Sequence, residues 1–297
     1  MEKLKVGFLT FEYFHGRRKG SIGSTMIRVR WLIDMWKKVG PDIGEAEIYK
    51  IGEKYDVIVY QKVYDPPMAE IFNGKKILDI CDPDWRHWGH RVKQTLDLCD
   101  AAVGATKPLA EYITNLMPDK PVWLIPDRVN FDKFIASKEH RGTGPTKTAI
   151  WYGFSDNFHA LELAVDSIVE LGLDLTVISN KPFNLPPSIT KKIKLINYPW
   201  SNEHWQSDIQ SGDVVINPKL KKGKWKYKSN NKTLNAWALG MPVAQNEAEL
   251  KLLMTEEQRV AEVEKRLIEV RRDWNIEKSV IEYKKLIASL YETTKNN

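Results

Sequence analysis

Short apolar runs alternate with longer stretches of helical periodicity along this chain. The first run, residues 5–10 (KVGFLT), is apolar almost throughout, which is typical of a strand buried on both faces of a parallel sheet. A loop rich in Gly and Ser follows it, and residues 25–39 then carry apolar side chains at helical spacing. The chain therefore opens as strand, loop and helix.

The same alternation continues in two successive sets. Further strands are predicted in the first set at residues 56–60, 76–80, 101–104 and 122–125, and in the second at residues 149–152, 173–178, 193–196, 214–217 and 242–244. Helix-like or turn-rich stretches separate these runs. Such an order predicts an α/β fold in which helices cover both faces of parallel sheets.

A length of 297 residues exceeds what one hydrophobic core usually organises, so we expect two Rossmann-like domains facing one another. The polar, aperiodic stretch 138–147 is the candidate linker. We expect the first domain over residues 1–140, the second over 147–272, and a C-terminal helix over 273–297. An apolar stripe on that helix should pack back on the first domain: Ile276, Val280, Tyr283, Ile287 and Leu290.

The composition, 42% hydrophobic and 28% charged, fits a packed globular protein and excludes a wholly disordered one. Two cysteines and the absence of an export-type leader predict a cytoplasmic protein without a disulfide framework. No apolar run reaches the roughly 20 residues needed to span a bilayer, so membrane contact would be peripheral, as for a lipid-linked acceptor. A net charge of +6 favours anionic partners: nucleotide diphosphates, nucleic acid or lipid head groups.

Because ligands of open parallel sheets bind beyond the carboxyl ends of the strands, the loops after the strands are the candidate sites. In the first loop Gly23 and Ser24 precede a helix whose amino end could hold a phosphate. The loop has neither a G-x-G-x-x-G nor a G-K-[ST] pattern, so a simple helix cap is the alternative.

The loop at residues 79–90 (DICDPDWRHWGH) is dense in carboxylates and histidines. Asp82 with Asp84 could bind a divalent metal, or one of them could serve as general base toward an acceptor hydroxyl. The alternative is that Asp82 caps a turn before Pro83. His87 and His90 lack a third nitrogen or sulfur ligand, so no zinc site is expected.

Two loops of the second set also carry candidate groups. Residues 153–157 (GFSDN) lie between a predicted strand and a helix, a place that favours an anion, and residues 179–181 could meet a nucleotide base or ribose or form a plain turn. Residues 219–232 contain seven lysines with two interleaved aromatics. Their first part could be a solvated loop, whereas Lys228 and Lys232 flank the start of a helix, where a diphosphate would gain both charge and N–H groups.

The last stretch resembles the GT-B glycosyltransferases, in particular the retaining "group 1" family, whose C-terminal halves carry a K-S-x-N-K-x-x-E-x-x-A-x-G-x-P-V sequence. Here it stands as KSNNK at residues 228–232, followed by Asn235, Ala238 and LGMPV at residues 239–243. Further matches occur in order along nearly the whole chain: a Gly/Ser loop before Arg28, residues 79–82, residues 125–134 and residues 151–157.

The resemblance implies a GT-B architecture and transfer of a sugar from a nucleotide-diphosphate sugar, most simply a UDP-sugar, to a hydroxyl acceptor, without a tightly bound cofactor or a required metal. Donor-binding residues are expected in both halves of the chain: Gly23, Ser24, Gly153, Ser155, Asn180, Trp200, Lys228, Ser229, Asn231, Lys232 and Asn235. Asn235 departs from the family, which has a glutamate there for the ribose hydroxyls; an amide can also hydrogen-bond a ribose.

The acceptor side is expected in the first half, with Arg28, Asp84 and His87 as binding residues. The family's usual catalytic histidine has no secure counterpart, so Asp82, His15 and Tyr13 are candidates by position, and stereochemistry stays open. A hydroxymethylated base in viral DNA and a cell-surface or lipid-linked glycan are equally compatible acceptors. A non-catalytic nucleotide-sugar or nucleic-acid binding protein is the alternative function, and Asn235 is its main support.

Overall fold

The computed structural model describes residues 3–14, 23–220 and 222–292. It divides into two compact units, each built on one parallel sheet. Unit 1 comprises residues up to Asn130, the short segment Gly223–Ser229 and the residues from Asn275 onward; unit 2 comprises Phe131–Lys222 and Asn230–Trp274. The polar stretch 138–147 packs within unit 2, where the Lys138 N–H donates to the Leu239 carbonyl at 2.8 Å.

The sheet of unit 1 has six parallel strands in the order β2-β1-β3-β4-β5-β6. Their bounds are β1 Leu4–Thr10, β2 Gly44–Ile48, β3 Val57–Gln61, β4 Lys75–Ile80, β5 Ala101–Gly104 and β6 Val122–Leu124. The edge strand β2 (GEAEI) is absent from the predicted strands because glutamates alternate with small residues in it. Gly44 is required there, since a Cβ would strike the backbone of Leu4 on β1.

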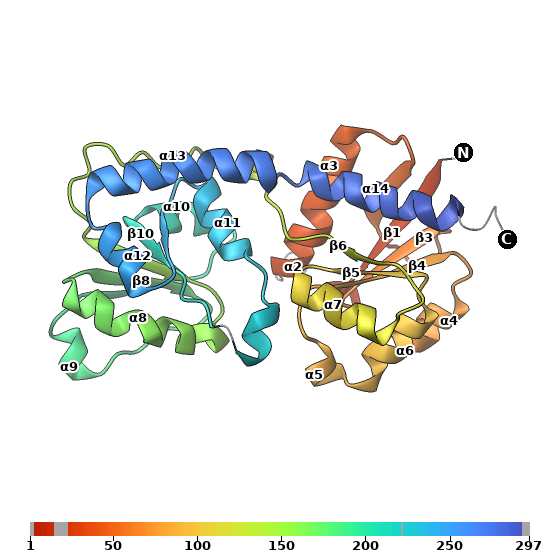
Figure 1. Cartoon of the computed structure of the whole chain (residues 1–297), viewed down its shortest axis with the longest axis horizontal. Coiled ribbons are helices and arrows are strands. Elements are labelled where there is room, and N and C mark those ends of the chain that lie inside the picture. The colour runs from red at the N-terminus through yellow and green to blue at the C-terminus, as the bar shows by residue number, and fades with distance from the viewer. Residues whose placement is uncertain (1–2, 15–22, 221, 293–297) are drawn as a thin grey trace. The chain divides into compact units, whose positions relative to one another are not determined.

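Helices cover both faces of this sheet (Figure 1). Their bounds are α1 Phe11–Phe14, α2 Gly23–Thr25, the π-helix η1 Met26–Arg30, α3 Trp31–Val39, α4 Pro66–Ile71, α5 Trp85–Trp88, α6 His90–Leu98, α7 Lys107–Leu116, the 3-10 helix η4 Gly223–Tyr227 and α14 Glu277–Glu292. Helices α4, α6 and α7 contribute Ala69, Leu96 and Ile113 to the core cluster on one face.

The C-terminal helix α14 packs on unit 1, beside α3, as the apolar stripe predicted (Figure 1). All five residues of the stripe are buried, and the Tyr283 ring meets Phe8 of β1 edge to face at 5.8 Å. Lys284 bonds Asp42 and the Gly40 carbonyl at the far end of α3. Unit 1 is therefore completed by residues far along the chain from its first strand.

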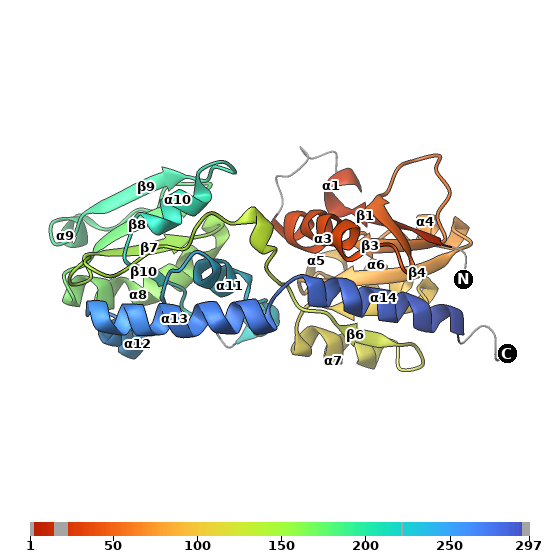
Figure 2. The ribbon, with the colours of Figure 1, turned by 90° about the horizontal axis from the view of Figure 1, so that it is seen from above.

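Unit 2 has a five-stranded parallel sheet in the order β11-β10-β7-β8-β9. Its strands are β7 Thr148–Tyr152, β8 Asp174–Ser179, β9 Leu195–Pro199, β10 Val214–Ile216 and β11 Val243–Ala244, and its helices are η2 Phe131–Lys133, η3 Ser155–Asn157, α8 Phe158–Glu170, α9 Pro187–Thr190, α10 Trp205–Gln210, α11 Asn231–Ala238, α12 Glu247–Leu252 and α13 Glu256–Asp273. Helix α8 lies on one face of the sheet and α10 and α11 on the other (Figure 2). The predicted α/β class with two Rossmann-like parts is thus confirmed.

Among the described residues, no helix combines the length and the apolar character that crossing a bilayer requires.

Candidate functional site

The carboxyl edge of the unit 2 sheet contains the point where the strand order reverses. From β7 the chain moves outward to β8 and β9, then returns to the other side of β7 for β10 and β11. Loops that leave neighbouring strands in opposite directions open a crevice at such a point, and ligands of doubly wound folds bind there. The residues that follow β7 and β10 are therefore placed to line such a crevice.

Gly153 follows β7 directly and lies against the side chain of Lys232. Its φ of 148° is a conformation that favours glycine, and a Cβ at this position would collide with the Lys232 ammonium. That ammonium lies 4.5 Å from the centroid of the Trp151 ring, and the Tyr152 hydroxyl donates to the Lys232 backbone carbonyl. Glycine is thus needed so that a cation can lie close to the end of β7.

The ends of β8 and β9 bring further predicted donor-binding residues to this edge. The Ser155 N–H donates to Oδ1 of Asn180 at 2.8 Å, which joins the loop after β7 to the loop after β8. The backbone N–H of Trp200 donates to the Ser179 carbonyl at 2.9 Å, so Trp200, which follows β9, lies next to the end of β8. Trp200 is 42% exposed and its ring stacks on Trp205, which leaves part of a flat apolar side chain accessible at this edge.

Helix α11 supplies Asn231, Lys232 and Asn235, all three half-buried. It is tied to the end of β10 by a hydrogen bond of 2.9 Å from Nδ2 of Asn217 to Oγ1 of Thr233. The structure thus gathers the predicted donor-binding residues of unit 2 along one edge. Their role in binding stays a prediction.

The carboxyl edge of the unit 1 sheet carries a different set of groups, centred on Asp82. Nζ of Lys62, the residue after β3, lies 2.7 Å from Oδ2 of Asp82, and Nζ of Lys228 lies 2.6 Å from Oδ1. Burial opposes the ionisation of Asp82, but the two ammonium groups outweigh it and hold the pKa of Asp82 below its usual value. Asp82 is therefore a carboxylate at neutral pH and a weak base.

Asp84 lies on the other side of Lys62. Its Oδ2 accepts a hydrogen bond of 2.7 Å from the Tyr64 hydroxyl and lies 3.5 Å from Nζ of Lys62. Burial, partly offset by Lys62, raises the pKa of Asp84. Both carboxylates therefore face the ammonium group of Lys62. Within the described ranges, no group of three or more His, Cys, Asp or Glu side chains is arranged to bind a metal ion.

Lys62 and Tyr64 are absent from the sequence-based candidates. Lys62 is the only non-glycine described residue with a positive φ, 56°, and such strain tends to persist where the surrounding contacts determine it. Its side chain is only 15% exposed, and the neighbouring carboxylates raise its pKa although burial opposes its charge. Lys62 lies two residues beyond the strand predicted at residues 56–60, and Asp82 lies two residues beyond the strand predicted at residues 76–80. These matching positions after two strands were the signal that could have found Lys62.

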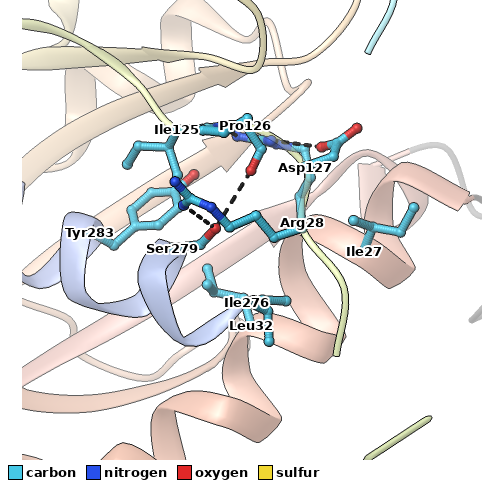
Figure 3. A pocket seen from close by; sticks show the side chains of 10 residues that line it. Ile27, Arg28, Leu32, Ile125, Pro126, Asp127, Ile276, Ser279 and Tyr283 are labelled. Atoms are coloured by element: carbon cyan, nitrogen blue, oxygen red, sulfur yellow. Dashed lines mark hydrogen bonds and ion pairs between the residues drawn. The ribbon is translucent and has the colours of Figure 1, made fainter. Parts of the chain in front are cut away.

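Arg28 is buried inside unit 1. Its guanidinium is buried, bonds both carboxylate oxygens of Asp79, and donates to Asp127 at 2.8 Å and to the Ile125 carbonyl at 3.0 Å. It lines a pocket with Tyr283 (Figure 3). The pocket volume is about 10 Å³, on the order of one water molecule. These contacts make Arg28 a structural cation, and its predicted contact with an acceptor stays untested.

The remaining predicted residues are distributed as follows. Gly23 and Ser24 belong to the short helix α2, and His87 is exposed on α5. His15 and the Tyr13 side chain lie outside the described residues. The KSNNK motif is divided: Lys228 and Ser229 belong to unit 1, Asn231 and Lys232 to unit 2.

Comparison with known proteins gives a fold but no sequence family. No family model matches the chain, and no curated protein matches it. Solved structures do match, and those named below are GT-B glycosyltransferases that share 9–10% of its residues. The chain therefore has the GT-B fold.

Two of these structures align over almost the whole of both chains. Anabaena Alr3699/HepE, in complex with UDP and glucose, has a TM-score of 0.63 at 9% identity, covering 96% of this chain and 100% of its own. An alpha-glucosyltransferase in complex with UDP and a 13-mer DNA has a TM-score of 0.62 at 9% identity, with 97% and 100% covered. TarM has a TM-score of 0.56 at 10% identity; 77% of this chain aligns with 54% of TarM, so the chain spans about half of that protein.

Proposed function

We propose that this chain is a glycosyltransferase that moves a sugar from a nucleotide-diphosphate sugar to a hydroxyl acceptor. The observation that carries the proposal is the cation at the topological switch point of unit 2: Lys232, held beside Gly153 at the end of β7. Negative charge develops on the nucleotide diphosphate as the sugar leaves, and a fixed ammonium at that place stabilises it.

The surroundings of Lys232 suit the rest of such a donor. A glycine lets phosphate oxygens approach the backbone closely, and the exposed ring of Trp200 and the side chain of Asn180 offer a flat surface and an amide to a base or ribose. Structures of HepE and of the alpha-glucosyltransferase contain UDP, which supports a UDP-sugar as donor. With charge compensation supplied by lysine, no tightly bound metal or cofactor is required in this proposal.

Unit 1 would receive the acceptor at its Asp82–Lys62 edge. Two lysines hold Asp82 in its ionised form, so it is a good hydrogen-bond acceptor for an acceptor hydroxyl. By accepting that hydrogen bond, the carboxylate orients the hydroxyl toward the sugar. Asp84 and His87 follow in the same loop and are proposed to contact the acceptor. Asp82 is thus proposed as the residue that positions the attacking oxygen.

The structural neighbours point to two different classes of acceptor. One structural neighbour binds DNA, whereas another is a lipopolysaccharide outer core galactosyltransferase. The net charge of +6 is compatible with both DNA and an anionic glycan. A cytoplasmic location, peripheral to a membrane if the acceptor is lipid-linked, remains part of the proposal.

The test is a screen of the purified chain against UDP-, GDP-, TDP- and CMP-sugars, with melting temperature and release of free nucleotide measured in parallel. Donor binding stabilises the folded state by mass action, so one nucleotide class should raise the melting temperature and be released when acceptor is added. A shift without release under any acceptor would favour the non-catalytic binding protein that Asn235 suggested. No shift and no release would overturn the proposal.

A further inference from the structure

The lysine-rich segment Gly223–Ser229 packs on unit 1 through an aromatic cluster. The Trp85 and Tyr112 rings stack with centroids 3.8 Å apart and an interplanar angle of 16°, and Tyr227 meets Trp85 edge to face at 5.1 Å. The Tyr227 carbonyl accepts a hydrogen bond of 3.2 Å from Oγ1 of Thr106, the N-cap residue of α7. Helices α5, α7 and η4 thus meet at one place.

This packing concentrates cations beside the aromatic cluster. Arg86 on α5 and Lys226 on η4 are exposed, and Lys224 is half-exposed. Within the described residues, none of these three cations forms an ion pair with a carboxylate. Lys224 and Lys226 lie over the rings of the residues that follow them, at 5.1 and 4.7 Å from the centroids.

The acidic groups of the same elements are already compensated. Asp82 is paired with Lys62 and Lys228, and Asp84 is bonded by Tyr64 and faces Lys62. On α7, Glu111 lies 3.8 Å from Nζ of Lys107. Local repulsion of an anion is therefore small, and the excess charge of this surface is positive.

We infer that this basic–aromatic surface, formed by Trp85, Arg86, Tyr112, Lys224, Lys226 and Tyr227, binds a nucleic-acid strand. Exposed cations attract a phosphate backbone, and half-exposed aromatic rings stack with bases, the combination that single-strand binding surfaces use. The parallel Trp85–Tyr112 pair is a stack that a base can continue. As the identification of the acceptor, the inference rests on the proposed glycosyltransferase function.

A membrane surface fits these features less well. Interfacial segments place large apolar side chains on their outer face, beside the basic residues. Among the described residues, the large apolar side chains that are exposed include none from α5, α7 or η4. The aromatic rings here are instead held half-buried against one another, so they present ring faces and edges but no apolar wedge.

The experiment measures fluorescence anisotropy of a labelled single-stranded DNA of about 20 nucleotides, longer than the roughly 4–16 nucleotides of a typical site. The full chain and the double variant Arg86→Glu/Lys226→Glu are compared between about 50 and 200 mM salt. We expect the variant to bind on the order of tenfold more weakly, with a salt slope smaller by about 1.4, since each phosphate contact on a single strand contributes about 0.7.

The matched control is Lys191→Glu/Lys192→Glu, two exposed lysines just beyond α9 of unit 2, which makes the same change of charge elsewhere. Equal loss of affinity in both double variants would show that only net charge acts, and would overturn the inference. So would equal competition by inorganic polyphosphate at matched phosphate concentration, or tighter binding to phosphatidylserine vesicles than to DNA.

Donor-induced shifts in melting temperature are measured on the same variants to separate the two proposals. If Arg86→Glu/Lys226→Glu binds DNA as tightly as the unchanged chain and keeps a normal donor shift, only the surface assigned here is overturned. DNA binding without any donor shift overturns the glycosyltransferase function and leaves a nucleic-acid binding protein.

Discussion

The carboxyl edges of the two sheets handle charge in opposite ways. In unit 1 the edge holds buried charge: Asp82 and Asp84 stay close together because Lys62 lies between them. In unit 2 the edge presents a cation beside a glycine and an amide, and the carboxylate of the same loop, Asp156, is exposed. The two parallel sheets therefore differ at their carboxyl edges: unit 2 places a cation beside a glycine, and unit 1 places a carboxylate between two lysines.

The contrast extends to the titratable groups that each unit buries. Unit 1 keeps Lys62 charged despite burial, whereas unit 2 keeps His140 neutral, with Nε2 only 2.9 Å from the Gly240 carbonyl. The fold alone therefore does not determine the charge at the two edges; the residues that follow each strand determine it.

The largest expected effect comes from removing the cation of unit 2. In Lys232→Ala we expect the rate of sugar transfer to fall by about 10²–10³, because one fixed group that stabilises leaving-group charge is worth about that much. Nucleotide release under saturating donor measures it. Lys191→Ala, which removes an exposed lysine of unit 2, is the control. A comparable loss of transfer rate in both variants would refute the role proposed for Lys232.

Next is the carboxylate of unit 1. Asp82→Asn keeps the shape but removes the charge that Lys62 and Lys228 face, so we expect transfer to fall by about 10² while the donor-induced shift in melting temperature is unchanged. Asp119→Asn, an exposed aspartate of unit 1, should leave both unchanged. If donor binding falls together with transfer in Asp82→Asn, the separate roles proposed for the two edges, donor binding in unit 2 and acceptor positioning in unit 1, are wrong.

Gly153→Ala should affect unit 2 in two ways. The strained backbone should lower the free energy of unfolding by about 1–3 kcal/mol, and the displaced Lys232 should weaken donor binding. Gly172→Ala is a matched control, because Gly172 also has a positive φ, 65°, but its Cβ would meet no neighbour. Chemical denaturation and donor titration of both variants separate strain from collision; equal donor affinities would refute the contact with Lys232.

The smallest effect concerns pH. Burial, only partly offset by the Gly240 carbonyl, lowers the pKa of His140 below the ordinary 6.5, so the unfolded chain binds this proton more readily than the folded chain. Stability from this group is complete above pH 6.5 and is lost as pH falls toward the folded-state pKa, by at most about 1.4 kcal/mol per pH unit. Denaturation of His140→Gln should show a shallower fall below that pH, and an unchanged slope would contradict the neutral state.

The fold was predictable because apolar runs and helical stripes repeat along the chain. The stripe from Ile276 to Leu290 predicted the packing of α14, and the runs at both β7 and β8 mark buried central strands. Strand β2 was missed because an edge strand with alternating glutamates lacks the apolar signal of a central one.

The candidate site was predictable only where a loop follows a strong strand. The neighbourhood of Gly153, Asn180 and Lys232 follows from strand order, whereas the pairing of Lys62 with Asp82 also depends on the register of β3 against β4 and on the unusual backbone conformation of Lys62. The buried contacts of Arg28 could not be foreseen, because nothing local in the sequence distinguishes an arginine that meets Asp79 from one that faces solvent.

The division of the chain into units has a consequence for biosynthesis. Unit 1 needs α14, which the ribosome makes only after all of unit 2, and it also incorporates the segment Gly223–Ser229 from within the second half. A nascent chain ending near Asn130 would expose the face that Tyr283 and Leu286 cover in the finished protein. Unit 1 therefore begins to emerge from the ribosome first, yet it is completed only after α14 has been made.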